Sequence, residues 1–284
     1  MKDFDGRIAV ITGAGSGIGQ SLAVQLAERG CVLALGDLDA EGLARTKERV
    51  GKTSAICSMH KLDVADRNAV EAFAADVIER HGSVHLLFNN AGVTLVDTVQ
   101  NVDYDDFNWL MNINFWGVVY GTKAFLPHLR KAADEAHIIN ISSLFGLLSL
   151  PLQSAYNASK FAVRGFTEAL KMELAGSAVG VSCVHPGGIK TGIARNSRVR
   201  AESLDVSKEE LNSQFDKAAR TTPDQAAAKT IRGVEKNRRR ILIGPDAKIA
   251  DWIVRLFPGS YEKIMRFEVG VRRKARLQSS VRAG

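Results

Sequence analysis

The feature that most constrains the fold is the alternation of short apolar segments with longer amphipathic ones. Seven runs rich in β-branched and other apolar residues, bounded by turn-forming residues, are expected to be strands. They are residues 7–12, 31–36, 55–60, 84–88, 137–142, 179–185 and 240–243. The stretches with helical periodicity are 17–29, 39–50, 66–81, 103–132, 153–176 and 223–236. Because parallel strands need crossover helices that bury both sheet faces, the order predicts an α/β, doubly wound, seven-stranded parallel sheet with helices on both faces.

Two segments do not fit this alternation. Residues 188–222 are rich in Gly, Arg, Ser and Asp, and a segment of that length is expected to be a lid, a binding loop or disordered. The other is a basic C-terminal extension, residues 245–284. We therefore expect one nucleotide-binding and catalytic domain over residues 1–244, followed by the extension.

Several classes of protein are disfavoured by what the sequence lacks. The polar first residues do not resemble a secretion signal, and no run reaches the roughly 18 apolar residues of a membrane span. We therefore expect a cytoplasmic protein. The three cysteines and six histidines are scattered without metal-ligand spacing, so no metal site is expected.

A glycine-rich turn follows the first expected strand and begins a helix. Gly13 suits a tight turn, Gly17 lets the backbone approach a pyrophosphate, and Gly19 allows close packing of helix and strand. Ser16 and Ile18 lie in the same turn, where the helix N-terminus supplies free N–H groups. Although an ordinary turn could contain these glycines, the position favours a dinucleotide site in a Rossmann fold.

Acidic residues at the next two strand ends point to the adenosine half of the cofactor. Asp37 ends the second strand, where a carboxylate can accept hydrogen bonds from ribose hydroxyls. Its neighbour Leu38, like Gly36 and Ser16, offers no cation for a 2′-phosphate, so NAD is favoured over NADP. Asp63 and Val64 are candidates for the adenine edge, although Asp63 could instead cap a helix.

Polar residues also follow the fourth and fifth strands. Asn90, Ala91 and Gly92 are small enough, or polar enough, to pass close to a ribose. Ser142 and Ser143 end the fifth strand, and Tyr156 and Lys160 follow four residues apart, on one face of an expected helix. A phenol has a pKa near ~10, and a nearby ammonium would favour its ionised form, as acid/base catalysis requires.

Taken together, these residues resemble the short-chain dehydrogenase/reductase family over about residues 6–244. The sequence contains T-G-x-x-x-G-x-G at the glycine turn, N-N-A-G at 89–92, Y-x-x-x-K at 156–160 and Pro186-Gly187 after the sixth strand. In the family the catalytic serine precedes the tyrosine by thirteen residues, which selects Ser143. The family's structural asparagine, in N-x-x-G, matches Asn114.

The resemblance implies roles for individual residues. Tyr156 would exchange the proton, Lys160 would lower its pKa and bind the nicotinamide ribose, and Ser143 would position the carbonyl. Asn114 would hold a water that leads to Lys160. The segment that approaches the nicotinamide would contain Pro186, Gly187, Ile189 and Thr191. The resemblance also implies a homodimer or homotetramer.

The residues assigned to the substrate side are mostly apolar, and no Arg or Lys closely precedes Tyr156. The assigned lining is Val93, Leu95, Phe145, Leu147, Leu148, Leu150 and Leu152. A lipophilic secondary alcohol or ketone is therefore favoured, although some of these leucines could be core. An NADPH-dependent carbonyl reductase of the same fold and a non-catalytic NAD-binding regulatory or membrane-associated protein stay open.

Basic charge is concentrated near the C-terminus. Residues 229–284 contain fifteen Lys and Arg against five Asp and Glu, a net of +10, whereas the whole chain carries +7. Trp252, Leu256 and Phe257 lie among these charges. We expect this extension to cap the substrate pocket or pack on a subunit, with peripheral contact to an anionic membrane as the alternative. Nucleic-acid binding is not expected.

Overall fold

The computed structural model describes residues 1, 3–51, 53, 55–132, 135–192, 198–199, 213 and 219–263. These ranges contain the complete central sheet and the helices that cover it. Most of the expected lid segment at 188–222, and the extension beyond residue 263, lie outside the described residues.

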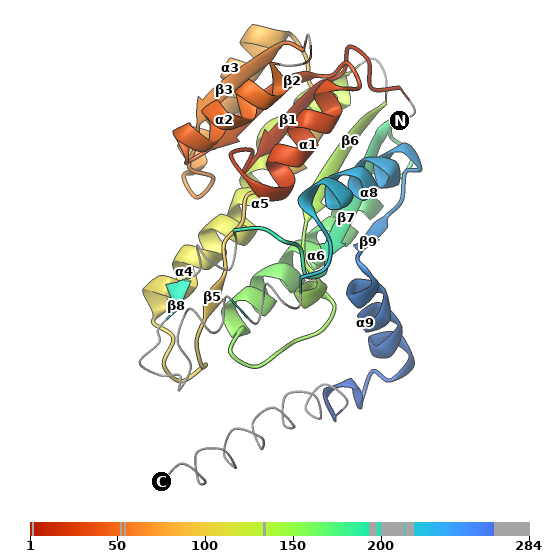
Figure 1. Ribbon diagram of the computed structural model, residues 1–284. Helices are drawn as coiled ribbons and strands as arrows, with labels where there is room; N and C mark the ends of the chain where they lie inside the picture. Colours follow the sequence, from red (N-terminus) through yellow and green to blue (C-terminus); the bar gives the residue numbers. More distant parts are fainter. Residues whose placement is uncertain are drawn as a thin grey trace.

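The core of the protein is a seven-stranded sheet in which every neighbouring pair is parallel (Figure 1). Its strands are β1 (Ile8–Thr12), β2 (Val32–Asp37), β3 (Cys57–Lys61), β4 (Leu86–Asn89), β6 (Ala136–Ile141), β7 (Val179–Pro186) and β9 (Arg240–Ile243). The spatial order is β3-β2-β1-β4-β6-β7-β9. The chain thus winds outward from β1 to β3 and then returns beside β1, so the strand order reverses between β1 and β4. The predicted doubly wound sheet is confirmed.

Helices cover both faces of this sheet. One layer contains α1 (Gly17–Ala27), α2 (Ala40–Val50) and α8 (Pro223–Glu235), and the other contains α3 (Arg67–His81), α5 (Gly117–Lys131) and α6 (Ser154–Glu173). The described chain also forms α4 (Tyr104–Met111), α9 (Pro245–Leu256), a π-helical turn η1 (Asn112–Trp116), a 3-10 turn η2 (Leu144–Gly146) and a small parallel pair, β5 (Leu95–Val96) with β8 (Arg198–Val199).

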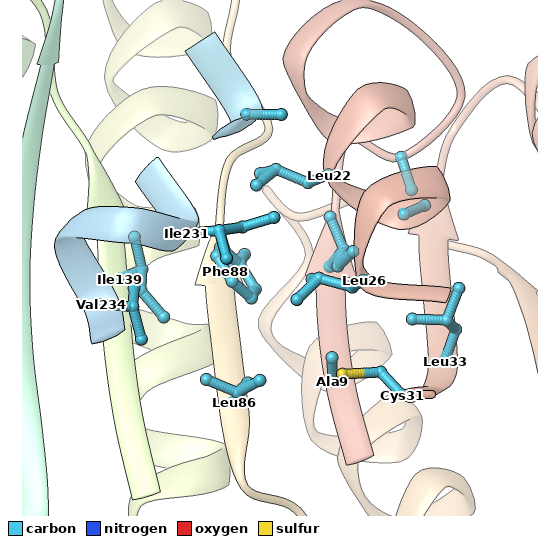
Figure 2. Packing of buried hydrophobic residues seen from close by; sticks show 14 of the residues in the cluster. Ala9, Leu22, Leu26, Cys31, Leu33, Leu86, Phe88, Ile139, Ile231 and Val234 are labelled. Carbon is cyan, nitrogen blue, oxygen red and sulfur yellow. The ribbon is translucent and has the colours of Figure 1, made fainter. Parts of the chain in front are cut away.

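Side chains alternate between the two faces along each central strand. On β4, Leu86 and Phe88 point to the layer of α1 and α8, whereas Leu87 packs in the opposite layer. Figure 2 shows Phe88 next to Ile231 of α8, in the cluster that also contains Leu22 and Leu26 of α1. The inner strands β1, β4 and β6 are buried on both faces, which agrees with their largely apolar sequences, whereas β3 at one edge of the sheet is more exposed.

The helix starts are largely set by local polar residues. Asp39 accepts a hydrogen bond from the amide of Gly42, and Asp66 accepts from the amides of Asn68 and Ala69, so each aspartate caps the helix that begins after it. Thr222 forms a capping box with Gln225 at the start of α8.

The prediction of one continuous helix over 103–132 was wrong in one respect. The π-helical turn η1 interrupts it between α4 and α5. Hydrophobic periodicity does not reveal such a turn, because the widening follows from long-range hydrogen bonds of Asn114 to the backbone of Val93. The short β5–β8 pair and α9 were not expected either.

Helix α9 packs on the sheet domain through small and polar residues. Ala247 and Ala250 are buried, and Asp251 forms an ion pair with Arg240 of β9. The large apolar residues expected to pack on the fold or cap the pocket instead lie on the exposed side, including Trp252 and Leu256. Within this chain, Trp252 and Leu256 therefore neither cap the pocket nor pack on the fold.

A buried polar chain ties two strands to two helices. Asn89 on β4 donates to Oδ1 of Asn140 on β6 (2.8 Å) and to Thr122 on α5 (3.1 Å). Asn140 in turn donates to Thr167 on α6 (3.0 Å). All four side chains are almost fully buried, so each depends on the others for its hydrogen bonds.

We predict that Asn140→Ala lowers the free energy of unfolding by about 1–3 kcal/mol, because it leaves a buried donor on Asn89 without its acceptor. Urea denaturation measures the change. Ser177→Ala, which removes a hydroxyl from a local turn, is the control and is expected to have a smaller effect. Equal stability of Asn140→Ala and the wild type would show that these buried hydrogen bonds between side chains do not stabilise the fold.

Candidate active site

The residues singled out in the sequence lie where the central strands end. The glycine turn follows β1, Asp37 ends β2, and Asn90 follows β4. Ser143 follows β6, and Pro186 ends β7. Because all these strands are parallel, their carboxyl ends meet at one edge of the sheet, the edge where doubly wound folds bind ligands.

The glycine turn leaves the N-terminus of α1 open. Gly13 has φ of +66°, and a Cβ there would lie 2.7 Å from Cα of Ala91. A Cβ on Gly19 would collide with the carbonyl oxygen of Gly13. Ser16, the N-cap, makes no side-chain cap, and the first turn contains no acidic residue. The free N–H groups therefore suit an anion such as a pyrophosphate.

The segment after β7 lies against this turn. A Cβ on Gly17, whose φ is +52°, would lie 3.1 Å from Cγ2 of Thr191. The amide of Gly187 donates to the carbonyl of Ile243, which places the segment directly after Pro186 at the sheet edge. Ile189 is buried and bridges to Thr221. The structure thus brings the predicted nicotinamide segment and the predicted pyrophosphate turn together; Ile18 packs against the core beneath them.

Asp37 is fixed beside the glycine turn. Its carboxylate accepts hydrogen bonds from the amide of Gly15 (2.7 Å) and the amide of Asp39 (2.9 Å). The next residue, Leu38, exposes 61% of its surface. The carboxylate therefore lies at the open edge, near the N-terminus of α1.

The other two predicted adenosine residues are placed differently from each other. Asp63 is exposed and accepts from the amide of Ala65 (2.9 Å), which shapes the turn after β3. Val64 is buried against Gly117, where an added Cβ would lie 3.0 Å away. Asp66, rather than Asp63, caps α3, so the capping role considered for Asp63 falls to its neighbour.

Asn90 and Ala91 close the gap between β4 and the glycine turn. The amide side chain of Asn90 donates to the carbonyls of Thr12 (2.9 Å) and Gly13 (3.0 Å). The hydroxyl of Thr12 accepts from the amides of Asn90 and Ala91. Sequence reasoning did not assign Thr12 a role, although its position directly before Gly13 was a usable signal.

The π-helical turn holds Asn114 beside the expected catalytic lysine. Asn114 is fully buried, accepts from the amide of Val93 (2.8 Å) and donates to its carbonyl (2.9 Å). A Cβ on Gly92 would lie 3.3 Å from both Oδ1 of Asn114 and Nζ of Lys160. The absence of a side chain on Gly92 therefore leaves room between these two polar groups.

Ser143, Tyr156 and Lys160 form the centre of the site. The side chain of Ser143 lies beside the hydroxyl of Tyr156 and acts to lower the pKa of the phenol. Nζ of Lys160 lies 5.6 Å from the centre of the Tyr156 ring and donates to the carbonyl of Ile141 (3.1 Å). Ser142 is turned away, because its hydroxyl donates to the backbone carbonyl of Lys160 (2.9 Å). The geometry therefore selects Ser143 of the two serines.

Burial disfavours the charged forms of both titrating groups. It raises the pKa of Tyr156, although the hydrogen bond from Ser143 opposes that increase. It also lowers the pKa of Lys160 to about 8. A phenolate beside an ammonium would offset the desolvation of each, so the two groups should titrate as a coupled pair.

Apolar side chains surround the phenol. The ring of Phe145 meets that of Tyr156 edge to face, with centres 5.9 Å apart. Val93 and Leu95 belong to the same cluster, whereas Leu147 and Leu148 are buried. Of the expected lining, Leu150 and Leu152 are half-buried in the loop before α6.

His185 was missed in the sequence although it directly precedes Pro186. Its Nδ1 lies 3.0 Å from the carbonyl oxygen of Ser143, and the ring is fully buried. Burial lowers the pKa of His185 to about 4, so the ring is neutral at pH 7. The neutral ring must carry its proton on Nδ1 to make this bond, which holds the backbone of Ser143 in place.

Within the described residues, no three His, Cys, Asp or Glu side chains gather in a group that could hold a metal ion. None of the described helices has the length and apolar character needed to cross a membrane.

The sequence and fold match known oxidoreductases. The family model for the short chain dehydrogenases matches residues 7–202. A Mycobacterium tuberculosis protein named "Putative oxidoreductase SadH" is 47% identical over 268 residues, which cover 93% of this chain and 96% of that protein. A Burkholderia phymatum short chain dehydrogenase/reductase solved with NAD is 36% identical, with a TM-score of 0.82 over 92% of this chain and 96% of that one.

A second solved structure, levodione reductase, is 27% identical with a TM-score of 0.77, and the match covers 87% of this chain and 98% of that one. The family match spans most of the sheet domain, and the similarity to the M. tuberculosis relative extends over nearly the whole of both chains. The chain belongs to the short-chain dehydrogenase/reductase family of oxidoreductases.

Proposed function

We propose that this protein is an NAD(H)-dependent dehydrogenase that interconverts a lipophilic secondary alcohol and its ketone. The observation that carries the proposal is the gathering of three side chains, with Ser143 beside the buried phenol of Tyr156 and the ammonium of Lys160 5.6 Å from the centre of the same ring. The relative solved with NAD supports a nicotinamide cofactor.

The open N-terminus of α1 and Asp37 would hold the pyrophosphate and the adenosine ribose. Lys160 would bind the nicotinamide ribose, and the segment containing Gly187 and Thr191 would lie along the ring. Asp63, Val64 and Asn90 to Gly92 would complete the adenosine and ribose contacts. A bound nicotinamide supplies the hydride acceptor for oxidation and the hydride donor for reduction.

The protein's own residues would handle the proton. In oxidation the phenolate oxygen of Tyr156 would take the proton of the substrate hydroxyl while hydride leaves the carbon that carries this hydroxyl. The hydroxyl of Ser143 would donate a hydrogen bond to the substrate oxygen as that oxygen becomes a carbonyl. Lys160 stabilises the phenolate, and Asn114 would hold a water leading to Lys160. Reduction reverses each transfer.

The apolar surroundings of Tyr156 favour a lipophilic substrate. Phe145, Val93 and Leu95 lie in its cluster. An NADPH-dependent reductase of the same fold stays as the second candidate. It would require the exposed edge beside Asp37 to accept a 2′-phosphate. We retain a homodimer or homotetramer as the proposed assembly.

A panel of secondary alcohols, offered with NAD and with NADP and followed by absorbance of the reduced nicotinamide, tests the proposal. We expect turnover of apolar alcohols with NAD. Turnover restricted to small polar alcohols would contradict the substrate class, and turnover with NADP alone would contradict the cofactor.

Removing the phenol oxygen tests the mechanism. Tyr156→Phe leaves the ring in place but abolishes the acid/base, so turnover should fall by about 10²–10⁴ while NADH still binds. Steady-state kinetics and titration calorimetry separate the two effects. Tyr104→Phe removes an exposed phenol and is the matched control. Near-normal turnover by Tyr156→Phe with a verified substrate would refute the proposed acid/base.

The pH profile tests the coupling between Tyr156 and Lys160. Oxidation requires the phenolate, so kcat/KM should rise with pH through the ionisation of Tyr156. Lys160→Met removes the cation that favours the phenolate, so the rise should move to higher pH and cofactor affinity should also weaken. A rise at the same pH in wild type and Lys160→Met would show that Lys160 does not set this ionisation.

Cofactor preference tests the role of Asp37. The carboxylate would repel a 2′-phosphate, so the wild type should bind NADH more tightly than NADPH. Asp37→Ala combined with Leu38→Arg should shift the preference toward NADPH, and Leu38→Arg alone is the control that keeps the carboxylate. Calorimetric titration measures both affinities. Tighter binding of NADPH by the unmodified protein would overturn the assignment.

A further inference from the structure

Helix α9 presents an unusual division of side chains. On its inner face, Ala247, Ala250 and Asp251 are buried against the domain, and Val254 on the same side is half-buried. Its outer face carries large apolar residues: Ile249 is 59% exposed, Trp252 64% and Leu256 62%. The spacing i, i+3 and i+7 puts these three on one side of the helix. Phe257, which is 50% exposed, continues the same surface past the helix end.

The helix is firmly attached, so this surface has a fixed orientation. Asp251 is paired with Arg240 of β9 and with Arg255 of its own helix (3.0 Å). At the other end of the helix, Asp246 accepts from the amide of Gly188 (2.6 Å). These contacts keep the small residues inward. Rotation that would bury Trp252 against the domain would break both attachments.

Basic charge accompanies the apolar face. Lys248 and Arg255 are exposed and lie seven residues apart, on one side of the helix beside the apolar row. The two acidic residues of α9, Asp246 and Asp251, are both engaged toward the domain. After the helix, Glu262 and Lys263 offset each other in charge, and residues 264–284 add six basic residues against one acidic residue.

We propose that the outer face of α9 docks on an anionic lipid surface. A row of exposed apolar residues that includes tryptophan and is bordered by Lys and Arg suits the boundary between headgroups and acyl chains. A second copy fits less well, because pairing two copies through this face would bring together two helices whose exposed charges beside the apolar row, Lys248 and Arg255, have the same sign. The charges that disfavour self-association attract anionic headgroups.

The location of α9 links this surface to the active site. The helix begins directly after β9, at the same edge of the sheet as the active site (Figure 1). It contacts η2, the turn that follows Ser143, and Asp246 binds the segment after Pro186. Docking would therefore hold the site close to the lipid. Direct entry of a lipophilic substrate from the lipid is a consequence that rests on the proposed function, whereas lipid binding itself does not.

Vesicle binding by the full chain tests the proposal. The probes are phosphatidylcholine vesicles with and without phosphatidylglycerol, at low and high salt, with sedimentation to measure partitioning. We expect binding that requires phosphatidylglycerol and weakens with salt, since exposed charges are screened over about 10 Å at 0.1 M. No binding to the anionic vesicles would overturn the proposal.

Substitutions locate the binding surface. Ile249→Ser with Trp252→Ser should weaken partitioning at least about tenfold, since the apolar contact of two large side chains is lost. Lys248→Gln should reduce it less. Met172→Ser and Lys131→Gln remove an exposed apolar residue and a charge at the opposite edge of the sheet, and both should bind like the wild type. NADH binding by each variant checks that it folds.

Two results would contradict the location or the occupant. Unchanged partitioning of Ile249→Ser with Trp252→Ser would show that another part of the chain, such as residues 264–284, binds the lipid without α9. A lower molar mass of this variant in light scattering would show that the face contacts a second copy instead. The wild-type mass in this variant, together with its loss of vesicle binding, is the outcome we expect.

Discussion

The burial of one ammonium group shapes the whole active site. Lys160 is 3% exposed, and a buried cation is costly unless polar groups surround it. Its Nζ donates to the carbonyl of Ile141, and its own backbone carbonyl accepts from Ser142. A Cβ on Gly146 would collide with the Ser142 hydroxyl, so the chain can pack here only as glycine. The side chain of Lys160 is thus enclosed by the end of β6, the turn after β6 and helix α6.

The parallel sheet explains why residues far apart in sequence meet at this point. The strand order reverses between β1 and β4, and Asn90 joins the ends of these two strands by donating to Thr12 and Gly13. Deeper in the sheet, Asn89 and Asn140 join β4 to β6. These two polar connections fix neighbouring strand ends against each other. The distance between the glycine turn and the Tyr156 region is therefore set by rigid strands rather than by loops.

The layout of the fold was predictable because the inner strands of the sheet are buried on both faces and the βα turns contain distinctive polar or glycine residues. Asp39 and Asp66 also indicated where α2 and α3 begin, because N-capping depends on residues that are close in sequence. The π-helical turn at Asn114 was not predictable, since it depends on Val93, twenty-one residues away. The pairing of Ser143 with His185 was hidden for the same reason, as it joins the ends of two strands.

The apolar residues of α9 show how the same pattern permits opposite structures. Ile249, Trp252 and Leu256 repeat at helical spacing, which in most surface helices marks the buried side. The decisive information lies in the residues on the other side of the helix. Ala247 and Ala250 allow α9 to approach the domain closely, and Asp251 supplies an ion-pair partner for Arg240. A row of apolar residues therefore identifies one face of a helix, but it does not tell what that face packs against. Here the buried ion pair selects the inner face, and the large side chains are left for a partner outside the described chain.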